Sequence, residues 1–542
     1  MKEFFFKIIF IVFICSTAAS QPDSRFRPFD WILYKGSGSI TSITEGFNFA
    51  YIGTELGGLK RFNLFGDYFD DPITTAQGLK SNHITATYFD KKTGLIWVAT
   101  PKYIQYSFSR EGDWFTYELN SLGLSNSDQI KRIGSSNKYI WLQARSSYVK
   151  LDQLSGMLIG IYATPNELSV EWGSEGYNNK SNLNNILLDY HILEDWVFNG
   201  NRLINGMGKT LAITTGFIGN QGKVYIGTDD GTLFYGTTTM EIFSPISSSI
   251  INTDINTIFD DGEYFWIGSQ DYITSRGISK LNMHTKISQI YSFDETINMT
   301  PTPIYSLYST DSQLWAGGNS LILYFDFRKN YWRTIGEERG VPGGKIWDLD
   351  VASKHVWVGS SMGLSRIECS TQSYDPSGIE SFFHQIPVYD IEFIEEDIWI
   401  GARSGLFIYS DKNPQLVSAL DYGSKKFPEQ FYYITAIEKF NRLVYVAGDM
   451  GIVKLDLDEK EWNIVCNPAL YQNKIIYSLA ANDKYLFLGT DSGLLRINNR
   501  TGLIKDYLFS FIGQVNEIIL QRNIIWLGTN NGLIRFKWKK DL

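Results

Sequence analysis

The C-terminal stretch Trp526-Leu-Gly-Thr-Asn-Asn-Gly-Leu-Ile-Arg-Phe536 carries the pattern that decides the fold: an aromatic, an aliphatic and a small residue, a polar turn, a glycine and an apolar strand. The glycine after the turn accepts a positive φ without strain, so the pattern predicts a β-hairpin. Other clear copies are Phe487-Leu-Gly-Thr-Asp-Ser-Gly-Leu-Leu-Arg-Ile497, Trp357-Val-Gly-Ser-Ser-Met-Gly-Leu-Ser-Arg-Ile367 and Trp399-Ile-Gly-Ala-Arg-Ser-Gly-Leu-Phe-Ile408. A string that recurs in this way predicts a repeat architecture.

The aromatic residue at the start of each copy sets the spacing of the repeat. These residues are Tyr51, Trp97, Trp141, Tyr225, Trp266, Trp315, Trp357, Trp399, Tyr445, Phe487 and Trp526. Successive intervals lie between 39 and 49 residues, except for one of 84 residues between Trp141 and Tyr225. Because 84 is twice 42, the spacing predicts eleven visible repeats and a degenerate twelfth between Lys150 and Thr210.

Each repeat contains segments for four short strands. An apolar segment such as 388–393 precedes the aromatic anchor, the anchor opens a second strand, and a third and a fourth strand follow. Four strands in about 40–45 residues, with an aromatic and glycine signature, predict an all-β fold of the β-propeller class in which each repeat is one blade. The anchors are expected to pack between adjacent blades, since Trp, Tyr and Phe bury large areas.

The two ends of the chain bear on closure of the propeller. The last repeat stops after its third strand, whereas residues 30–34 have the pattern of a fourth strand that belongs to no repeat. Pairing the two would remove two open sheet edges at once. We therefore expect the N-terminal strand to complete the last blade.

The number of blades predicts two consecutive propellers, because a single one usually has four to eight. Counting seven anchors back from the C-terminus gives a second propeller in residues 249–542, closed by strand 30–34. The first propeller, in residues 21–248, then has about five blades, one of them degenerate. A division at residues 300–303 into six and six blades fits the spacing equally well.

The first residues of the chain predict export. Lys2 and Lys7 flank the start of an apolar run at 8–14, and the small residues 16–20 follow it. This is the pattern of a signal peptide, here residues 1–20, cleaved near Ser20. No later stretch reaches the roughly 18–20 apolar residues of a membrane helix. The protein is therefore expected in the periplasm or secreted, with no membrane span after cleavage.

Composition restricts the partners and the redox chemistry. The 542 residues include 49 Lys and Arg against 58 Asp and Glu, a formal net charge of −9, and 43% hydrophobic residues. These values indicate a folded chain without long disorder, and the dispersed acidic surplus disfavours nucleic acid as a partner. Cys369 and Cys466 are the only cysteines after residue 20, and one disulfide or two separate thiols are both open.

The repeat, with its lead-in Gly78-Leu-Lys-Ser-Asn-His-Ile84, resembles the two-component regulator propeller repeat of bacterial sensor proteins. Weaker lead-ins of the same kind stand at 340–346 and 123–130, and the resemblance spans roughly residues 30–540. The family usually carries such propellers ahead of a membrane helix and a histidine kinase, or in exported assemblies. Since this chain ends at its last blade, the resemblance implies ligand or partner binding, with a separate signalling or envelope protein as a further partner.

The turns between the second and third strands are the first candidate binding surface. They differ strongly between repeats, at 229–230, 270–276, 403–404, 491–492 and 530–531, while the flanking strand residues hardly vary in type. Rigid scaffolds usually carry function on such loops. Arg403, Asp491 and Asn530 are therefore predicted to contact a ligand on the rim formed by these turns and the inter-blade lead-ins. Turns that are merely free to vary in solvent are the alternative.

The first strands of the repeats supply a second candidate. Asp348, Asp390 and Glu517 occupy equivalent positions in three repeats, and the first strand of each blade lines the central channel of a propeller. Their carboxylates would there favour a cation or a basic group of a partner. The alternative is that they are channel residues in contact with water.

Two classes of function follow. The phosphate-loop pattern at 205–210 is incomplete, and no HExxH or GxSxG motif is present, so no catalytic residue, metal or cofactor is predicted. The first class is an exported non-catalytic binding propeller of the sensor type, which recognises a glycan, a peptide or a protein. The alternative is a periplasmic polysaccharide lyase or hydrolase with a site at the channel mouth, sheltered by the irregular segment 164–205.

Overall fold

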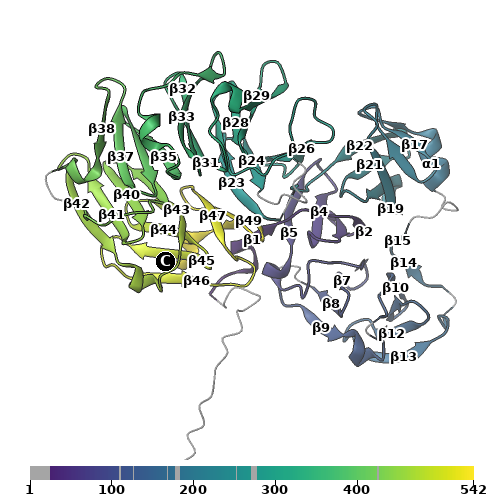
Figure 1. Ribbon diagram of the computed structural model, residues 1–542. Coiled ribbons are helices and arrows are strands. Elements are labelled where there is room, and N and C mark those ends of the chain that lie inside the picture. The colour runs from purple at the N-terminus through teal and green to yellow at the C-terminus, as the bar shows by residue number, and fades with distance from the viewer. Residues whose placement is uncertain are drawn as a thin grey trace, which may run out of the picture.

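The computed structural model describes residues 25–108, 112–125, 127–167, 169–176, 183–251, 253–269, 277–423 and 427–542. The predicted signal peptide 1–20 and the turn 270–276 lie outside the described residues. Within the described part the strands form eleven antiparallel-rich sheets, most of them four-stranded. Figure 1 shows these sheets in two groups, one that runs from teal through green to yellow and also includes the purple strand β1, and one coloured purple to blue-teal. The chain is thus all-β and built as two consecutive propellers.

The second group is a closed ring of seven blades. Its first three blades are β23 (Ile255–Asp260), β24 (Tyr264–Ser269), β25 (Gly277–Asn282) and β26 (Ser288–Ser292); β27 (Ser306–Ser309), β28 (Gln313–Gly317), β29 (Leu321–Asp326) and β30 (Tyr331–Gly336); and β31 (Ile346–Ala352), β32 (His355–Ser360), β33 (Gly363–Glu368) and β34 (Ser373–Tyr374). The next three are β35 (Val388–Ile394), β36 (Asp397–Ala402), β37 (Gly405–Ser410) and β38 (Gln415–Ser418); β39 (Ala436–Phe440), β40 (Leu443–Gly448), β41 (Gly451–Asp456) and β42 (Glu461–Cys466); and β43 (Ile476–Ala481), β44 (Tyr485–Thr490), β45 (Gly493–Asn498) and β46 (Ile504–Tyr507). The seventh consists of β47 (Val515–Leu520), β48 (Ile525–Thr529), β49 (Gly532–Phe536) and β1 (Trp31–Tyr34). Each inner strand contacts the next, and β47 returns to β23. This arrangement excludes a division into six and six blades.

The N-terminal strand closes this ring, as the sequence predicts. β1 pairs antiparallel with β49, from Trp31 opposite Phe536 to Tyr34 opposite Leu533. The Trp31 ring is fully buried and stacks on Phe536 with ring centroids 3.7 Å apart. The two ends of the ring are therefore joined by main-chain hydrogen bonds and by aromatic packing.

The aromatic anchors, and the glycine that follows two residues after most of them, explain how the blades fit together. The tryptophan and tyrosine anchors are all at most 2% exposed, and anchors such as Trp399 share a hydrophobic cluster with the following blade. The glycine lets the inner strand of that blade come close. A Cβ at Gly401 would lie 2.9 Å from the Ile434 side chain, and one at Gly268 would lie 2.5 Å from that of Ile304. The prediction of inter-blade packing by the anchors is confirmed.

The first group has four sheets. They are β2 (Ile40–Glu45), β3 (Phe49–Thr54), β4 (Leu59–Asn63) and β5 (Phe69–Ile73); β6 (Ala86–Asp90), β7 (Leu95–Ala99), β8 (Tyr103–Ser107) and β9 (Phe115–Glu118); β10 (Arg132–Ser136), β11 (Tyr139–Gln143), β12 (Tyr148–Asp152) and β13 (Leu158–Tyr162), joined by β14 (Glu171–Trp172); and β19 (Thr210–Ile218), β20 (Lys223–Thr228), β21 (Leu233–Thr237) and β22 (Ile242–Ile246), joined by β15 (Glu175–Gly176), β16 (His191–Ile192), β17 (Val197–Asn199) and β18 (Arg202–Ile204). The inner strands β19, β2, β6 and β10 are neighbours in that order.

The degenerate twelfth repeat predicted between Lys150 and Thr210 does not form a blade of its own in the described residues. After β13 the chain covers one flanking blade, where Glu167 pairs with Lys150 at 2.7 Å beside the Trp141 anchor. Helix α1 (Leu183–Asp189) and strands β16 to β18 then pack on the blade of β19 to β22, in one cluster with Trp196 and Phe234. The two halves of the segment thus cap the two blades that a further blade would have covered.

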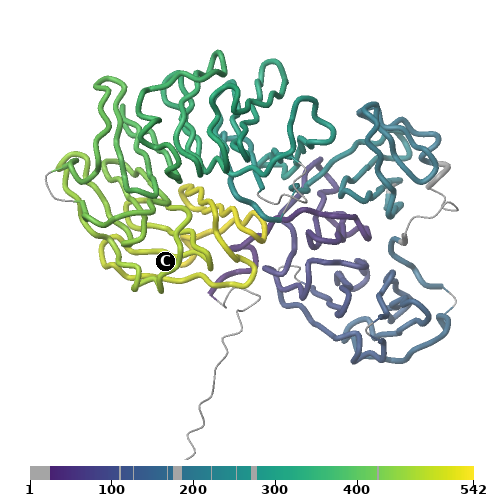
Figure 2. The backbone as a smooth tube through the Cα atoms, in the orientation of Figure 1, coloured from purple at the N-terminus to yellow at the C-terminus, as the bar shows by residue number. Residues whose placement is uncertain are grey.

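Residues 171–176 lie along the middle of the first ring. β14 pairs with β10 and β15 pairs with β19, while Ser174 Oγ accepts a hydrogen bond from the backbone N–H of Ile43 in β2 at 2.6 Å. Gly173 comes so close to β6 that a Cβ there would lie 3.0 Å from the carbonyl oxygen of Thr87. The segment therefore contacts the inner strands of all four blades. Figure 2 shows this part of the trace crossing between the blades of β10 and β19.

An ionic cluster joins the two rings at the closing blade. Arg535 of β49 donates two hydrogen bonds to Asp71 of β5, at 3.1 and 2.6 Å, and the Tyr34 hydroxyl donates a third at 2.6 Å. Short 3-10 turns connect many strands: η1 (Pro28–Asp30), η2 (Thr75–Gln77), η3 (Leu119–Leu122), η4 (Asn220–Gly222), η5 (Glu337–Arg339), η6 (Glu380–Phe383), η7 (Ala419–Asp421), η8 (Pro468–Tyr471) and η9 (Trp538–Asp541). Cys369 and Cys466 are separate thiols. The division of the chain at residues 248 and 249 stays a prediction.

Candidate functional site

Most inner strands of the second ring, but not β27 or β39, have a β-bulge near their first residue. The pairing register shifts between Ile346 and Asp348 in β31, between Val388 and Asp390 in β35, and at the same place in β43 and β47. A bulge places an extra residue on one strand and changes the direction of the side chains beside it. At each bulge the extra residue is followed by the residue that faces the channel, so the bulges position the candidate site.

The structure brings together the three channel carboxylates predicted from the sequence. The carboxyl groups of Asp348 and Asp390 hydrogen-bond to each other across the boundary between β31 and β35. Glu517, on β47, interacts electrostatically with both of them. Since β47 is not adjacent to β31 or β35 in the ring, this interaction acts across the channel.

Three further carboxylates of the same cluster were missed in the sequence. Asp350 follows Asp348 by two residues, Glu392 follows Asp390 by two, and Glu438 is the matching residue of β39. Side chains two residues apart on a strand share one face. This period of two is the signal that would have found them.

Burial raises the pKa of all six carboxyl groups, and neighbouring carboxylates raise the pKa of four of them further. The pKa is raised to about 7 at Asp390 and at Glu438, to about 8 at Glu517 and to about 9 at Glu392. At Asp348 it lies well above the ordinary value, because of burial and the Asp390 charge. The cluster therefore holds protons near neutral pH.

The same carboxylates bind the neighbouring blade. Ile391 N donates to Asp348 at 2.8 Å, and Phe393 N donates to Asp350 at 2.6 Å, both from β31 to β35. Ile437 N of β39 donates to Asp390, and Ala481 N of β43 donates to Glu438 at 3.3 Å. Three successive boundaries between blades are thus held by carboxylate groups.

Above the channel, the turns and lead-ins predicted to form one rim are hydrogen-bonded to each other. Tyr433 N donates to the carbonyl of Arg403, Asp491 N to that of Ile475, and Asn530 N to that of Gln514, each at 3.1 Å. Each pair joins a turn between second and third strands to a lead-in: that of the next blade for Arg403, and that of the same blade for Asp491 and Asn530. Arg403, Asp491 and Asn530 are exposed and lie on this one rim of the second ring.

The rim residues differ in how free their side chains are. The Arg403 guanidinium lies 5.4 Å from the centre of the Tyr433 ring, a cation–π contact that leaves it exposed. The Asn530 side-chain oxygen instead accepts a hydrogen bond from Gln514 N at 2.9 Å. That oxygen holds the turn, so Asn530 has a structural contact that the sequence did not predict.

Exposed aromatic and apolar side chains surround the mouth of the channel. Tyr477, which follows Ile476 at the β43 bulge, is 37% exposed, and Tyr433 is 44% exposed. Other exposed members on the same turns and lead-ins are Met362, Tyr432, Met450 and Ile475. In contrast, Tyr305 is buried beneath Lys345, whose ammonium lies 5.3 Å from its ring centre. The mouth thus offers aromatic surface together with charged groups.

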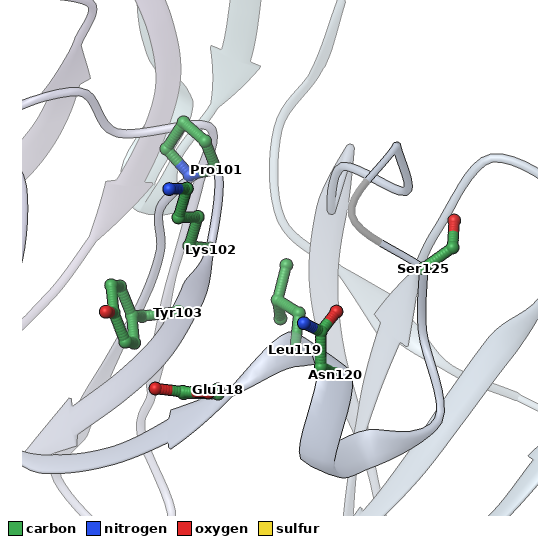
Figure 3. Close-up of a pocket in the computed structure, with 7 residues that line it drawn as sticks. All are labelled: Pro101, Lys102, Tyr103, Glu118, Leu119, Asn120 and Ser125. Carbon is green, nitrogen blue, oxygen red and sulfur yellow. The ribbon is translucent and has the colours of Figure 1, made fainter.

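Two cavities lie away from this mouth. One of about 360 Å³ in the first ring is lined by residues of β8, β9 and η3, and Figure 3 shows Tyr103 and Glu118 on one side of it and Ser125 on the other. The second, of about 450 Å³, lies between the blades of β23 and β27, beside Tyr264 and Lys280. Neither contains a candidate residue predicted from the sequence.

No group of three or more His, Cys, Asp or Glu side chains in the described part of the chain has an arrangement that would hold a metal ion. Likewise, none of the helices in the described ranges is long and apolar enough to cross a membrane.

No family model matches the chain, and no curated protein matches it. Among solved structures, the extracellular domain of the one-component system BT4673 from B. thetaiotaomicron is 13% identical, with a TM-score of 0.41, over 92% of this chain and 70% of that one. PorZ, a surface component of the type-IX secretion system of Porphyromonas gingivalis, is 10% identical, with a TM-score of 0.34, over 94% and 87%. The assignment of two propellers rests on the strand pairing described above.

Proposed function

We propose that this protein is an exported, non-catalytic propeller of the sensor type that binds its ligand on the rim of the second ring. The observation that carries the proposal is the mouth of the channel, where exposed Tyr433 and Tyr477 lie beside the charged side chains of Arg403 and Asp491. Aromatic surface next to charged groups on a rigid scaffold is typical of binding sites for glycans, peptides and proteins. The resemblance of the repeat to sensor propellers supports the same function.

The test is capture by the full chain immobilised on a support. Envelope extract and an array of glycans and peptides are passed over it, and bound molecules are identified. Replacing Arg403, Tyr433 and Tyr477 by Ala removes the charged and aromatic surface of the rim, and we expect it to lower capture at least tenfold. The matched control replaces Glu395, Glu396 and Asp397 by Ala on the opposite rim, and should capture as well as the unchanged chain. The reverse pattern would contradict the proposed face.

One observation favours a second candidate, a hydrolase or lyase at the channel mouth. The side chains of Asp348 and Asp390 interact and burial raises the pKa of both, and paired carboxyl groups with raised pKa values perform general acid–base catalysis in many enzymes. On this alternative, a polysaccharide that the rim captures would be cleaved, and Asp390→Asn would abolish cleavage while leaving capture unchanged. Capture of an intact ligand by the unchanged chain would favour the binding propeller.

A further inference from the structure

The boundaries between blades in the second ring fall into two kinds. Carboxylates of β31, β35 and β39 hold three of them, as described above. Neutral groups hold three others: Asn256 Nδ2 donates to the carbonyl of Tyr305 at 2.6 Å, Ser306 Oγ to that of Ile346 at 3.2 Å, and Asn516 Nδ2 to that of Ile255 at 2.8 Å. One sector of the ring, the titratable sector, is thus joined by carboxyl groups whose pKa is raised by burial. The other is joined by neutral groups together with the Asp260 carboxylate, which accepts from Gln521 Nε2 at 3.0 Å.

Within the titratable sector, two carboxyl groups are hydrogen-bonded to each other. The contact between Asp348 and Asp390 requires a proton, because two carboxylates have no donor to share. Each of them also accepts a backbone N–H of the next inner strand. Loss of the shared proton would replace a hydrogen bond by repulsion between two charges inside one inter-blade contact.

The groups that face this pair, or face the carboxyl groups beside it, give little compensation for such a charge. They are Tyr308 of β27, Asp350 of β31, Glu392 of β35, Glu438 and Lys439 of β39, and Glu517 of β47. Lys439 is the cation of this set, and it faces Glu392. Glu517 reaches the pair from the opposite side of the channel, so repulsion acts across the axis as well as between neighbours.

We propose that the carboxyl groups on the inner strands of the second ring form a proton-dependent clasp. With the proton bound, the blades of β31, β35 and β39 are held together through the Asp348–Asp390 contact and its backbone partners. When the proton leaves in alkaline solution, this sector loosens while the sector joined by Asn256, Ser306 and Asn516 keeps its contacts. The burial that raises the carboxyl pKa values places the change between pH 7 and pH 9.

The test is the pH dependence of thermal unfolding of the full chain. Asp348→Asn imitates the protonated state, because its amide oxygen can accept from Ile391 N while its amide nitrogen donates to Asp390. We expect the Tm of the unchanged protein to fall between pH 6 and pH 9. In Asp348→Asn this decrease should be at most half as large. Asp483→Asn, in the exposed turn between β43 and β44, is the matched control and should leave the fall unchanged. An equal fall in all three proteins would overturn the clasp.

A second measurement does not depend on the folding of that variant. Infrared difference spectra of the unchanged protein should show a protonated carboxyl band at pH 7 that disappears on titration to pH 9.5. The band should be weaker in Glu517→Gln, which removes a carboxyl group that makes no hydrogen bond to a neighbouring blade among the contacts of the described residues. Absence of any protonated carboxyl band at pH 7 would also overturn the proposal.

Discussion

In the first ring, residues 171–176 of the chain lie along the axis. In the second ring, seven inner strands follow one another around a channel that is lined by carboxyl groups. The difference follows from the number of blades. Four blades leave β10 and β19 without a neighbour on one side, and residues 171–176 pair with both of them. Seven blades, with β1 completing the last, need no such segment. The ring that closes by its own blades is the one with an accessible mouth.

The largest effect is expected from removing the closing strand. Deleting residues 21–36 takes away β1 and leaves β49 as an open edge in the second ring. We expect loss of cooperative unfolding of the second ring, measured as loss of protection against hydrogen exchange in β47 to β49. Strands β6 to β8 of the first ring serve as the internal reference. An unchanged unfolding temperature would mean that β1 does not close the ring.

A smaller effect is expected from truncating one buried tryptophan in each ring. Trp31→Ala removes a fully buried ring stacked on Phe536, and such truncations cost about 3–5 kcal/mol. Trp141→Ala leaves a cavity beneath Tyr162 and Lys150, the latter paired with Glu167. These covering side chains can move into the cavity more easily than a whole blade could. We therefore expect Trp141→Ala to lower the free energy of unfolding, measured by chemical denaturation, by less than Trp31→Ala does. A larger loss at Trp141 would show that the cap behaves as a blade.

Because neighbouring blades approach closely, we expect replacement of the glycine two residues after an anchor to lower the free energy of unfolding. In Gly401→Ala the new methyl group would lie 2.9 Å from the Ile434 side chain and 3.1 Å from its carbonyl oxygen. Overpacking of this kind typically costs about 1–3 kcal/mol. Gly206→Ala is the matched control, since the nearest atom to its Cβ, in Asp195, is 3.5 Å away. Equal denaturation midpoints for the two variants would count against this role of the glycine.

The channel predicts that the two rings respond differently to pH. The pKa of Asp390 and Glu438 is raised to about 7, of Glu517 to about 8 and of Glu392 to about 9, so the folded ring binds protons that the unfolded chain has released. Stability from these protons is present at low pH and is lost as pH rises from about 7 to 9. After correction for intrinsic rates, exchange should accelerate in β35 and β39 between these values and not in β2 and β6. Equal acceleration in both rings would contradict the prediction.

The smallest effect on stability is expected at the rim. Arg403→Ala and Asp491→Ala alter exposed turns, where substitutions usually change the free energy of unfolding by under ~0.5 kcal/mol. Asn530→Ala should cost more, because its side chain accepts a hydrogen bond from Gln514 N. Denaturation midpoints in urea measure the difference. Similar midpoints for Asn530→Ala and Arg403→Ala would show that this hydrogen bond contributes little.

The sequence predicts the repeated parts of this fold well and the exceptions poorly. Every repeat carries an aromatic anchor and most carry the glycine after it, so the propellers could be inferred from the repeat, and the closing role of residues 30–34 from the fourth strand that the last repeat lacks. The segment 171–176 has no such repeat, and its place at the axis depends on pairing with two strands distant in sequence. That pairing is the reason why the expected twelfth blade is absent from the described residues.

The candidate site shows the same division. Equivalent positions in the repeat indicated Asp348, Asp390 and Glu517, which do interact with one another. The exposure of Tyr477 depends on the local backbone of the bulge, and the hydrogen bond that Asn530 accepts from Gln514 N depends on the conformation of its turn. Residue types alone specify neither conformation. Equivalent positions in the repeat therefore indicated three of the channel acids, whereas the residue types indicated only part of the rim.

The central claim, that the ligand binds on the rim of the second ring, is tested most directly by a hydrogen-exchange footprint. The full chain is compared with and without a molecule that it captures from envelope extract. The account predicts protection of the rim segments 387–390, 432–434 and 475–478, and no change in β2 to β22. Protection confined to the first ring, or to the turn at 395–397 on the opposite rim, would contradict it.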